Sequence, residues 1–507
     1  MLSKLFSAVS FLVASGAAFA GTLDGRAFAG KAAGERASVL VVMREQADLS
    51  GADAIADADE KRRFVFDALR ARADLSQRPL VERLERARAP YRSFYLVNML
   101  VVEADRALAE ELAQRRDVAS IAANRPASLA AIPTVRQETT ALPAAIEQNV
   151  LKIRAPEVWA LGATGQGIVV GIADTGVTWD HPTLKPHYRG WNGTTVSHDY
   201  NWRDAIHDAR VSNPCGSDSS VPCDDDSHGT ATASLAVGDD GAGNQIGVAP
   251  GARFIGCRNM DMGDGTPARY TECFQFFLAP TDRSGGNPRP ELGANVINNS
   301  WGCPASEGCT DPNVLQMVVE NVRAAGVLVA VAASNGGPTC ETLDVPAYYE
   351  ASFTVGATSI DDAIAIFSSR GPVTADGSNR LKPDLCAPGV FLRVAAPPSG
   401  YSGGFSGTSG STPMVAGAVA LLWSAVPALK GRPVETAELL RRTAVPLTSS
   451  TQDCGSFPGS AVPNAVFGWG RIDIEAAVEA AGSLVLAPRA AAPSRRRGSP
   501  RALAPRS

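Results

Sequence analysis

Short, continuously apolar runs alternate with helix-like runs between residues 150 and 480, and this alternation limits the fold more than any other feature. The runs lack the polar alternation of a half-exposed strand, so each is typical of a strand buried on both faces. Buried strands separated by helices predict an α/β fold, in which helices cover both faces of a parallel sheet. The expected strands include 168–173, 254–255, 295–298, 327–332 and 353–357, and the expected helices include 312–325 and 412–425.

A turn rich in glycine and serine leads into Ser409, and an apolar, helix-like run from Met414 to Leu422 follows it. A serine at such a junction exposes its hydroxyl beside the partial positive charge of the helix N-terminus. Gly407 and Gly410 let the backbone bend on either side and allow a substrate to approach closely. Ser409 is therefore either a helix cap, the commoner task of a serine in this position, or a nucleophile. A nucleophile requires a histidine and a carboxylate from elsewhere in the chain.

Both partners stand ahead of Ser409 in the chain. An apolar strand-like run ends at Asp174, and His228 opens a helix-like stretch after the acidic residues 224–226. Asn335 follows another strand-like run, so Asp174 and Asn335 are expected at the carboxyl ends of parallel strands, where α/β folds place their sites. The residues 224–226 are expected to form a solvated loop whose charge acts on His228. Each residue alone could cap a turn or a helix, but the order aspartate, histidine, serine favours a catalytic triad.

The blocks around these residues resemble those of the subtilisin-like serine proteases, the subtilases. The segments 174–176 (DTG), 228–230 (HGT) and 407–409 (GTS) match the family's aspartate, histidine and serine blocks. The resemblance covers most of residues 150–480, and the segment from 256 to 277 is similar to the bacillopeptidase F-like branch. Other matching segments are AVAASNGGP around Asn335, SWG at 300–302, KPD at 382–384 and APG at 387–389.

This resemblance implies a secreted endopeptidase that hydrolyses peptide bonds in protein or peptide substrates through an acyl-enzyme. Ser409 would attack the carbonyl carbon, His228 would carry the proton, and Asp174 would hold the imidazole. The alternative from a different class is a subtilase-fold binding protein that has lost turnover. A sedolisin-type acid peptidase is disfavoured, because that family uses a glutamate base where this chain has His228.

The resemblance also implies an oxyanion site and one edge of a substrate cleft. Asn335 would donate its side-chain amide to the oxyanion beside the Ser409 backbone N–H. An Asn-Gly turn is the alternative interpretation of Asn335. Ser300, Trp301 and Gly302 would supply an edge for an extended substrate backbone, although Trp301 is equally expected as core packing.

Some positions depart from the family's pattern. Gly410 and Ser411 follow the nucleophile where methionine and alanine are usual, and Met414 stands where histidine is usual. Ala231 and Ser234 replace a histidine and a glycine after the HGT block. None of these changes removes a catalytic atom, so they are expected to alter rate and specificity more than reaction type.

The chain divides into four segments by pattern. Residues 1–20 combine Lys4, an apolar run and an Ala-x-Ala site, which is typical of a secretory signal peptide. Residues 21–143 are expected to form a small α+β unit whose position is similar to that of subtilase propeptides, which inhibit the enzyme and assist its folding. The alternative is an accessory domain that stays attached. Residues 148–482 are the expected peptidase domain, and 483–507 an Ala-, Pro- and Arg-rich disordered tail. The propeptide pattern has strands at 38–43, 95–102 and 118–121 and helices at 61–88 and 108–115, and a polar linker with a maturation site follows at 131–145.

The chain has nine cysteines, and in a secreted chain they suggest disulfides. Proximity favours Cys215–Cys223, Cys257–Cys273 and Cys303–Cys309, although connectivity cannot be decided from sequence. Cys386 lies in an apolar block and is the candidate for an odd, buried thiol, which would leave Cys340 to pair with Cys454.

A net charge of −5 argues against nucleic acid as a partner, and no stretch after the signal is long enough for a transmembrane helix. The chain is expected to act as a monomer, with its own propeptide and its substrates as partners. The triad chemistry requires no cofactor and no metal ligand is assigned. Family members often bind calcium, and the loop 238–244 has oxygen ligands of a suitable kind. This loop is therefore a candidate site for a structural calcium ion.

Overall fold

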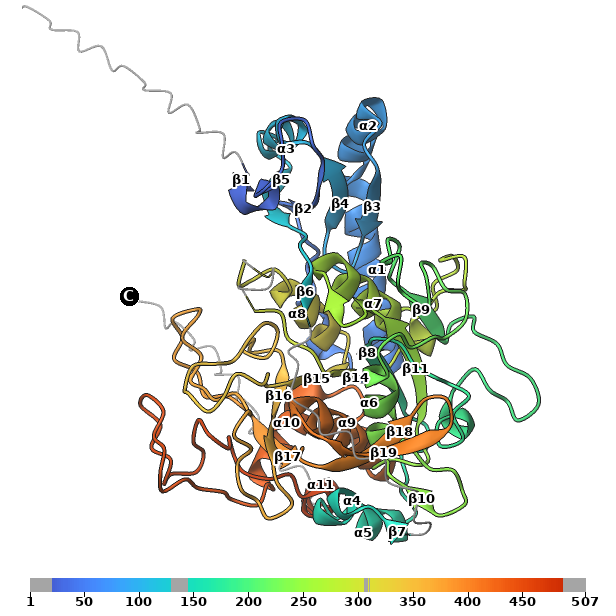
Figure 1. Ribbon diagram of the computed structural model, residues 1–507, viewed down its shortest axis with the longest axis vertical. Helices are drawn as coiled ribbons and strands as arrows, with labels where there is room; N and C mark the ends of the chain where they lie inside the picture. The colour runs from blue at the N-terminus through green and yellow to red at the C-terminus, as the bar shows by residue number, and fades with distance from the viewer. Residues whose placement is uncertain (1–20, 129–144, 305–308, 310, 487–507) are drawn as a thin grey trace, which may run out of the picture.

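The computed structural model describes residues 21–128, 145–304, 309 and 311–486 (Figure 1). The predicted signal peptide, most of the predicted linker and nearly all of the predicted tail lie outside these residues. The described chain forms a small N-terminal α+β unit that sits on a larger α/β unit (Figure 1). The α/β unit carries every residue that sequence analysis assigned to a site.

The α/β unit is organised by a parallel sheet, as the apolar runs predicted. Seven described strands pair in the order β17-β16-β15-β14-β8-β11-β9, and each pairing is parallel. The fold class is therefore confirmed. The strands are β8 (Val169–Asp174), β9 (Trp202–Asp204), β11 (Arg253–Arg258), β14 (Val296–Asn299), β15 (Leu328–Ala332), β16 (Phe353–Thr358) and β17 (Leu385–Pro388).

Helices cover both faces of this sheet, because successive strand residues point to opposite sides. In β15, Leu328 and Ala330 join one apolar core, while Val329 and Val331 join the other. The first core is formed with α4 (Gln148–Lys152), α5 (Ala155–Ala160), α6 (His228–Val237), α9 (Thr408–Ala425), α10 (Pro433–Arg442) and α11 (Ile474–Leu486). The second core is formed with α7 (Pro267–Leu278) and α8 (Gln316–Ala324).

Several helix boundaries differ from the predicted ones. Helix α9 begins at Thr408, ahead of the predicted start at 412, so Ser409 lies inside its first turn. Helix α8 begins at Gln316, since the segment 312–315 forms turns instead. Helix α11 continues to Leu486 and so extends into the predicted disordered tail.

The N-terminal unit has more strands than the predicted β-α-β-α-β pattern. Its sheet has the order β1-β5-β2-β4-β3. The predicted strand 95–102 is wrong in its first half, because Tyr95–Asn98 form the tight turn of the β3–β4 hairpin. The elements are β1 (Thr22–Leu23), β2 (Ala37–Met43), α1 (Ala58–Ser76), α2 (Arg78–Ala87), β3 (Tyr91–Phe94), β4 (Met99–Ala104), α3 (Arg106–Ala113) and β5 (Val118–Ala123).

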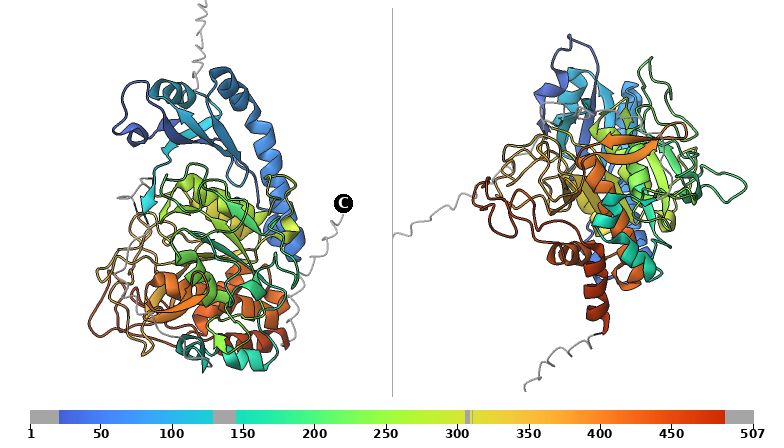
Figure 2. Two further views of the ribbon diagram at one scale, coloured as in Figure 1. Left: turned by 45° about the vertical axis from the view of Figure 1, so that its right-hand side comes forward. Right: turned by 60° about the horizontal axis from the view of Figure 1, so that its bottom comes forward.

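The two units share a buried interface. Helix α1 runs down the side of the α/β unit, where the left view of Figure 2 shows it as a long blue helix. Arg62 of this helix is 2% exposed and donates to the backbone oxygens of Gly293 and Ala294 at 3.0 and 2.8 Å. Tyr95 and Leu96 of the hairpin turn pack into the same core as α7 and α8.

Three small sheets lie beside the main one. A hairpin formed by β18 (Leu392–Ala396) and β19 (Gly400–Phe405) leads into α9. β7 (Ala145–Ile146) pairs with β10 (Asn244–Gln245). Strand β6 (Ala127–Ser128), which ends the first described segment, pairs antiparallel with β13 (Asp264–Gly265), and β13 pairs with β12 (Met260–Asp261).

Disulfide pairing follows the spacing argument. The bonds are Cys215–Cys223, Cys257–Cys273, Cys303–Cys309 and Cys340–Cys454, and Cys386 is free and buried. No helix among the described residues combines the length and apolar composition needed to cross a bilayer.

Candidate active site

A carboxylate and an imidazole meet where strand β8 ends and helix α6 begins. The Nδ1 atom of His228 lies 2.7 Å from Oδ1 of Asp174, whose side chain is fully buried. Ser227, just before the histidine, has a φ of +78°, a left-handed backbone conformation that is uncommon for a non-glycine residue. Gly176 is required nearby, because a Cβ there would collide with the backbone oxygen of Cys223. The contact directs Nδ1–H to the carboxylate and leaves Nε2 to accept a proton.

The surroundings of His228 favour its charged form. Burial lowers the pKa of His228, but the adjacent carboxylate of Asp174 and the charges of Asp226 and Asp224 raise it more strongly. The net pKa lies above the ordinary imidazole value of 6.5. Asp226 and Asp224 therefore raise the pKa of His228, as the sequence predicted.

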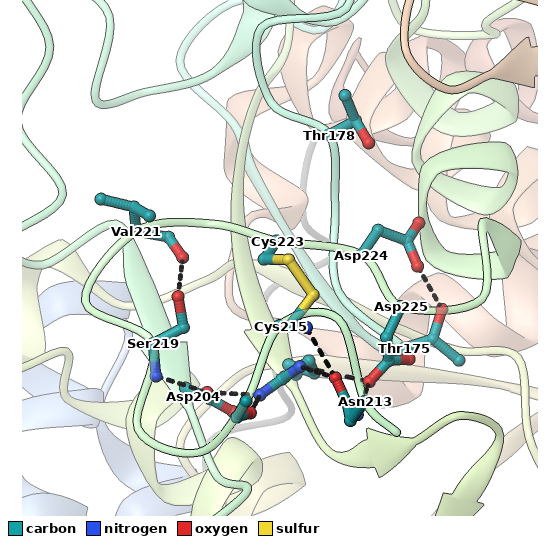
Figure 3. Close-up of a disulfide and its surroundings, with 12 residues drawn as sticks. Thr175, Thr178, Asp204, Asn213, Cys215, Ser219, Val221, Cys223, Asp224 and Asp225 are labelled. Atoms are coloured by element: carbon teal, nitrogen blue, oxygen red, sulfur yellow. Dashed lines mark hydrogen bonds and ion pairs between the residues drawn. A yellow bond between two sulfur atoms is a disulfide. The ribbon is translucent and has the colours of Figure 1, made fainter. Parts of the chain in front are cut away.

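Asp224 has a structural task that sequence analysis missed. Its carboxylate accepts a hydrogen bond from the Thr175 hydroxyl at 2.8 Å (Figure 3). It also accepts from the backbone amides of Ser227 and Thr230 at 2.9 and 2.8 Å. It thereby joins the residue after Asp174 to the N-terminus of α6. The prediction of a solvated acidic loop is wrong for Asp224, which is half-buried, because the helix N-terminus needs this acceptor.

The next aspartate belongs to a buried ion-pair network. Arg258 is the ladder partner of Asp174 on the adjacent strand β11, and its side chain has no exposed surface. Its guanidinium contacts Asp204 at 2.7 Å and Asp225 at 3.2 Å, and the Asp225 carboxylate also accepts from Asn213. Burial raises the pKa of Asp225 to about 6 against the opposing effects of Asn213 and Arg258. Asp225 therefore lies inside the protein, contrary to the prediction of a solvated loop.

Ser409 lies in the first turn of α9 and is 5% exposed. Its hydroxyl donates to the backbone oxygen of Ser300 at 3.1 Å. Helices α6 and α9 pack so closely that a Cβ at Gly417 would lie 2.7 Å from the Ala236 oxygen. The ring of Phe405, which precedes α9, lies 5.6 Å from the His228 ring. The same helix pair therefore carries the histidine and the serine.

Asn335 follows β15 and reaches the segment that carries Ser409. Its side-chain oxygen accepts from the backbone N–H and the hydroxyl of Thr408 at 3.0 and 2.9 Å. These two bonds fix the orientation of the carboxamide and leave Nδ2 as the group that can donate to a ligand. The asparagine is thus anchored to the residue just before Ser409.

The segment 300–302 follows β14. The Ser300 hydroxyl donates to the backbone oxygen of Ser409 at 3.2 Å. Trp301 is 1% exposed, and its ring stacks on Tyr270 with 3.7 Å between centroids, so this side chain packs in the core. A Cβ at Gly302 would lie 2.7 Å from the Ser334 hydroxyl, which explains the small residue there. A substrate contact from this segment would come from its backbone.

The three residues after Ser409 that depart from the subtilase pattern fit the local packing. A Cβ at Gly410 would lie 2.7 Å from a Leu392 methyl group. Ser411 donates to the backbone oxygen of Thr408 at 3.0 Å, and Met414 is fully buried. These positions support the start of α9 and supply no group that competes with Asp174, His228 or Ser409.

The loop between α6 and β10 does not fit a calcium ion. Both carboxylate oxygens of Asp240 already accept hydrogen bonds, from amides of the loop and from the Tyr401 hydroxyl. The side-chain oxygen of Asn244 accepts from the Arg393 guanidinium at 2.6 Å, so a cationic group of the protein already holds this ligand. Among the residues that the structure describes, no group of three or more acidic, histidine or cysteine side chains could hold a metal.

Comparison with known proteins agrees with this geometry. Residues 165–470 match the model of the Subtilase family. The chain is 35% identical over 441 residues to bacillopeptidase F of Bacillus subtilis, covering 83% of this chain and 29% of that protein. It is 32% identical over 304 residues to serine protease AprX and 28% identical over 285 residues to subtilisin E of the same species. These matches cover 55% and 56% of this chain and 61% and 62% of the two proteins, so the chain spans only part of each relative's length. The chain belongs to the subtilase family.

Proposed function

We propose that this chain is a serine endopeptidase that hydrolyses peptide bonds in proteins through Asp174, His228 and Ser409. The bond between His228 Nδ1 and Asp174 Oδ1 at 2.7 Å is the single observation that carries the proposal. It holds the imidazole in the tautomer that a general base requires. The similarity to AprX, whose name gives it as a serine protease, supports the same reaction.

In this mechanism, Ser409 Oγ attacks the substrate carbonyl while Nε2 of His228 takes its proton. The acyl-enzyme forms when the same proton passes to the leaving amine, and water then releases the acid by the reverse transfers. Asp174 keeps its negative charge and stabilises the imidazolium that forms in each step. In the resting structure the Ser409 hydroxyl donates to the Ser300 carbonyl, so attack requires a rotation of this hydroxyl toward Nε2.

Asn335 is proposed to stabilise the oxyanion through Nδ2, together with the Ser409 backbone N–H at the N-terminus of α9. Its carboxamide oxygen is held by Thr408, so the donor is oriented before the substrate arrives. Loss of one such donor typically lowers kcat by about 10²–10³. The backbone of 300–302 is proposed to bind the substrate strand.

Residues 21–143 are proposed to be an inhibitory propeptide, so that the chain is made as a zymogen. The Gln275 side-chain oxygen on α7 accepts from the Tyr95 and Leu96 amides at 2.8 and 3.1 Å, and Arg92 pairs with Glu272 at 2.7 Å. Strand β6 then adds to β13, which follows the strand paired with Asp174. Such strand addition supports a propeptide whose end approaches the substrate cleft.

Secretion belongs to the same proposal. The segment 1–20 has the pattern of a signal peptide, and the four disulfides of the described chain suit an oxidising compartment. Protein substrates and the propeptide are the proposed partners, and a structural calcium is not part of the proposal.

A fluorophosphonate probe tests the proposed function. The wild-type chain and Ser409→Ala are expressed, labelled and mapped by mass spectrometry. We expect label at Ser409 and N-terminal shortening in the wild type, with neither in the variant. A folded wild type that takes no label and never shortens would refute the enzyme and favour a binding protein.

A further inference from the structure

We propose that Thr232 is a positioning residue that holds the second oxygen of the catalytic Asp174. The inference rests on the proposed function, because it assigns Thr232 a part in the same reaction. Oδ1 of Asp174 accepts from His228 and from the Thr175 amide at 2.7 and 2.8 Å, while Oδ2 accepts from the Thr232 hydroxyl at 3.1 Å.

Helix geometry brings the histidine and the threonine to the same carboxylate. Thr232 follows His228 by four residues in α6, and side chains at this spacing lie on one face of a helix. Both therefore face the end of β8. The start of α6 is pressed against Asp174, since a Cβ at Gly229 would lie 3.0 Å from the Asp174 Cβ. The same helix thus supplies a hydrogen-bond donor to each oxygen of the aspartate.

The Thr232 hydroxyl has two acceptors within reach, and the carboxylate is the stronger. The Gly229 carbonyl also lies at 3.1 Å. In a helix that runs from His228 to Val237, this carbonyl has the backbone amide four residues later as its partner. Oδ2 carries charge in a site with no exposed surface, where a charge-assisted bond is stronger and an unmade bond costs more.

Holding Oδ2 has two effects on His228. A carboxylate fixed at both oxygens cannot pivot, so Oδ1 stays in line with Nδ1–H. A donor on Oδ2 also withdraws negative charge from the carboxylate, which restrains how strongly Asp174 favours the imidazolium. The other charges that reach His228 come from Asp226 and Asp224 in the loop before α6, whereas the Thr232 hydroxyl bonds to Asp174 and to the Gly229 carbonyl.

Thr232→Val removes the hydroxyl while keeping the shape of the side chain, and Thr232→Ser restores a donor. Thr271→Val is the matched control, because Thr271 is a buried threonine of α7 whose hydroxyl donates only to the Pro267 carbonyl at 2.8 Å. In Thr232→Val we expect kcat to be about three- to ten-fold lower. The pH at which kcat/KM falls to half on the acid side should rise by about half a pH unit. The serine variant should restore both values, and the control should change neither.

An NMR titration separates this inference from the proposed function. The chain has five histidines, so ring resonances of labelled histidine can be assigned by substitution and titrated in the Ser409→Ala background. A raised His228 pKa on adding Thr232→Val supports the inference without any catalysis. An unchanged or lowered His228 pKa overturns it, even if the wild type is fully active. A folded wild type that takes no fluorophosphonate and never shortens refutes the proposed function and leaves the titration to decide the role of Thr232.

Discussion

Replacing Asp224 by alanine should disable the candidate site without changing Asp174, His228 or Ser409. The carboxylate joins the Thr175 hydroxyl, next to Asp174, to the Ser227 and Thr230 amides at the start of α6. In Asp224→Ala, the first turn of α6 loses its acceptor, and the Thr175 hydroxyl loses the acceptor of its proton while it still accepts from the Gly229 amide. His228 then loses the fixed position that the helix gives it.

The magnitude follows from these lost bonds. Loss of a helix cap costs about 1 kcal/mol, and a buried hydroxyl that has lost its acceptor costs about 1–2 kcal/mol more. We therefore expect the free energy of unfolding to fall by about 2–3 kcal/mol. A displacement of His228 by about 1 Å would lower kcat/KM by roughly 10²-fold. Asp224→Asn keeps one acceptor oxygen, so its losses should be smaller.

The assay compares peptide hydrolysis and urea unfolding of Asp224→Ala with those of Asp226→Asn. The control removes a charge from the same loop, and Asp226 acts on His228 through its charge. We expect the control to keep its stability and kcat while the apparent pKa of His228 falls. Asp224→Ala with wild-type stability and wild-type kcat would show that α6 docks without this carboxylate and would refute the reasoning.

Three further predictions concern pH, metal and thiols. Because a protonated His228 cannot act as base and its pKa is raised, kcat/KM should fall as the pH drops through a value above 6.5, measured with a small peptide substrate. A chelator should leave the melting temperature unchanged, whereas Arg393→Met, which releases Asn244, should lower stability by about 1–2 kcal/mol in calorimetry. Cys386 should resist alkylation until the chain is unfolded, because burial raises the pKa of its thiol.

The strands and the cysteine pairs could be predicted because their causes are local. A run such as 328–332 is apolar at every position, and that pattern alone indicates a strand buried on both faces. Cys215 and Cys223 are eight residues apart, which favours pairing once the segment between them turns back. The end of β8 at Asp174 followed from the same pattern.

The predictions that were wrong concern residues whose conformation depends on contacts with residues far away in the sequence. Tyr95–Val97 are as apolar as a strand, but they lie in a turn because the Tyr95 and Leu96 amides donate to Gln275 of α7 and their side chains join the core of the other unit. Asp225 looked solvated, since nothing in its neighbourhood in sequence reveals that Arg258 on another strand would pair with it. Thr232 could have been found, because it stands one helical turn after His228.

Helix α6 contacts two carboxylates, and this arrangement explains why substitutions of Asp224 and of Thr232 should affect kcat, stability and the His228 pKa differently. Asp174 contacts the helix through His228 and Thr232, whereas Asp224 contacts its N-terminus through Thr230. Loss of Asp224 would shift the whole helix and so lower kcat and stability together. Loss of the Thr232 hydroxyl would free only the carboxylate and so move the His228 pKa. If the helix is the common element, the double variant should lose less activity than the product of the single losses, because a shifted helix no longer presents Thr232 to Oδ2.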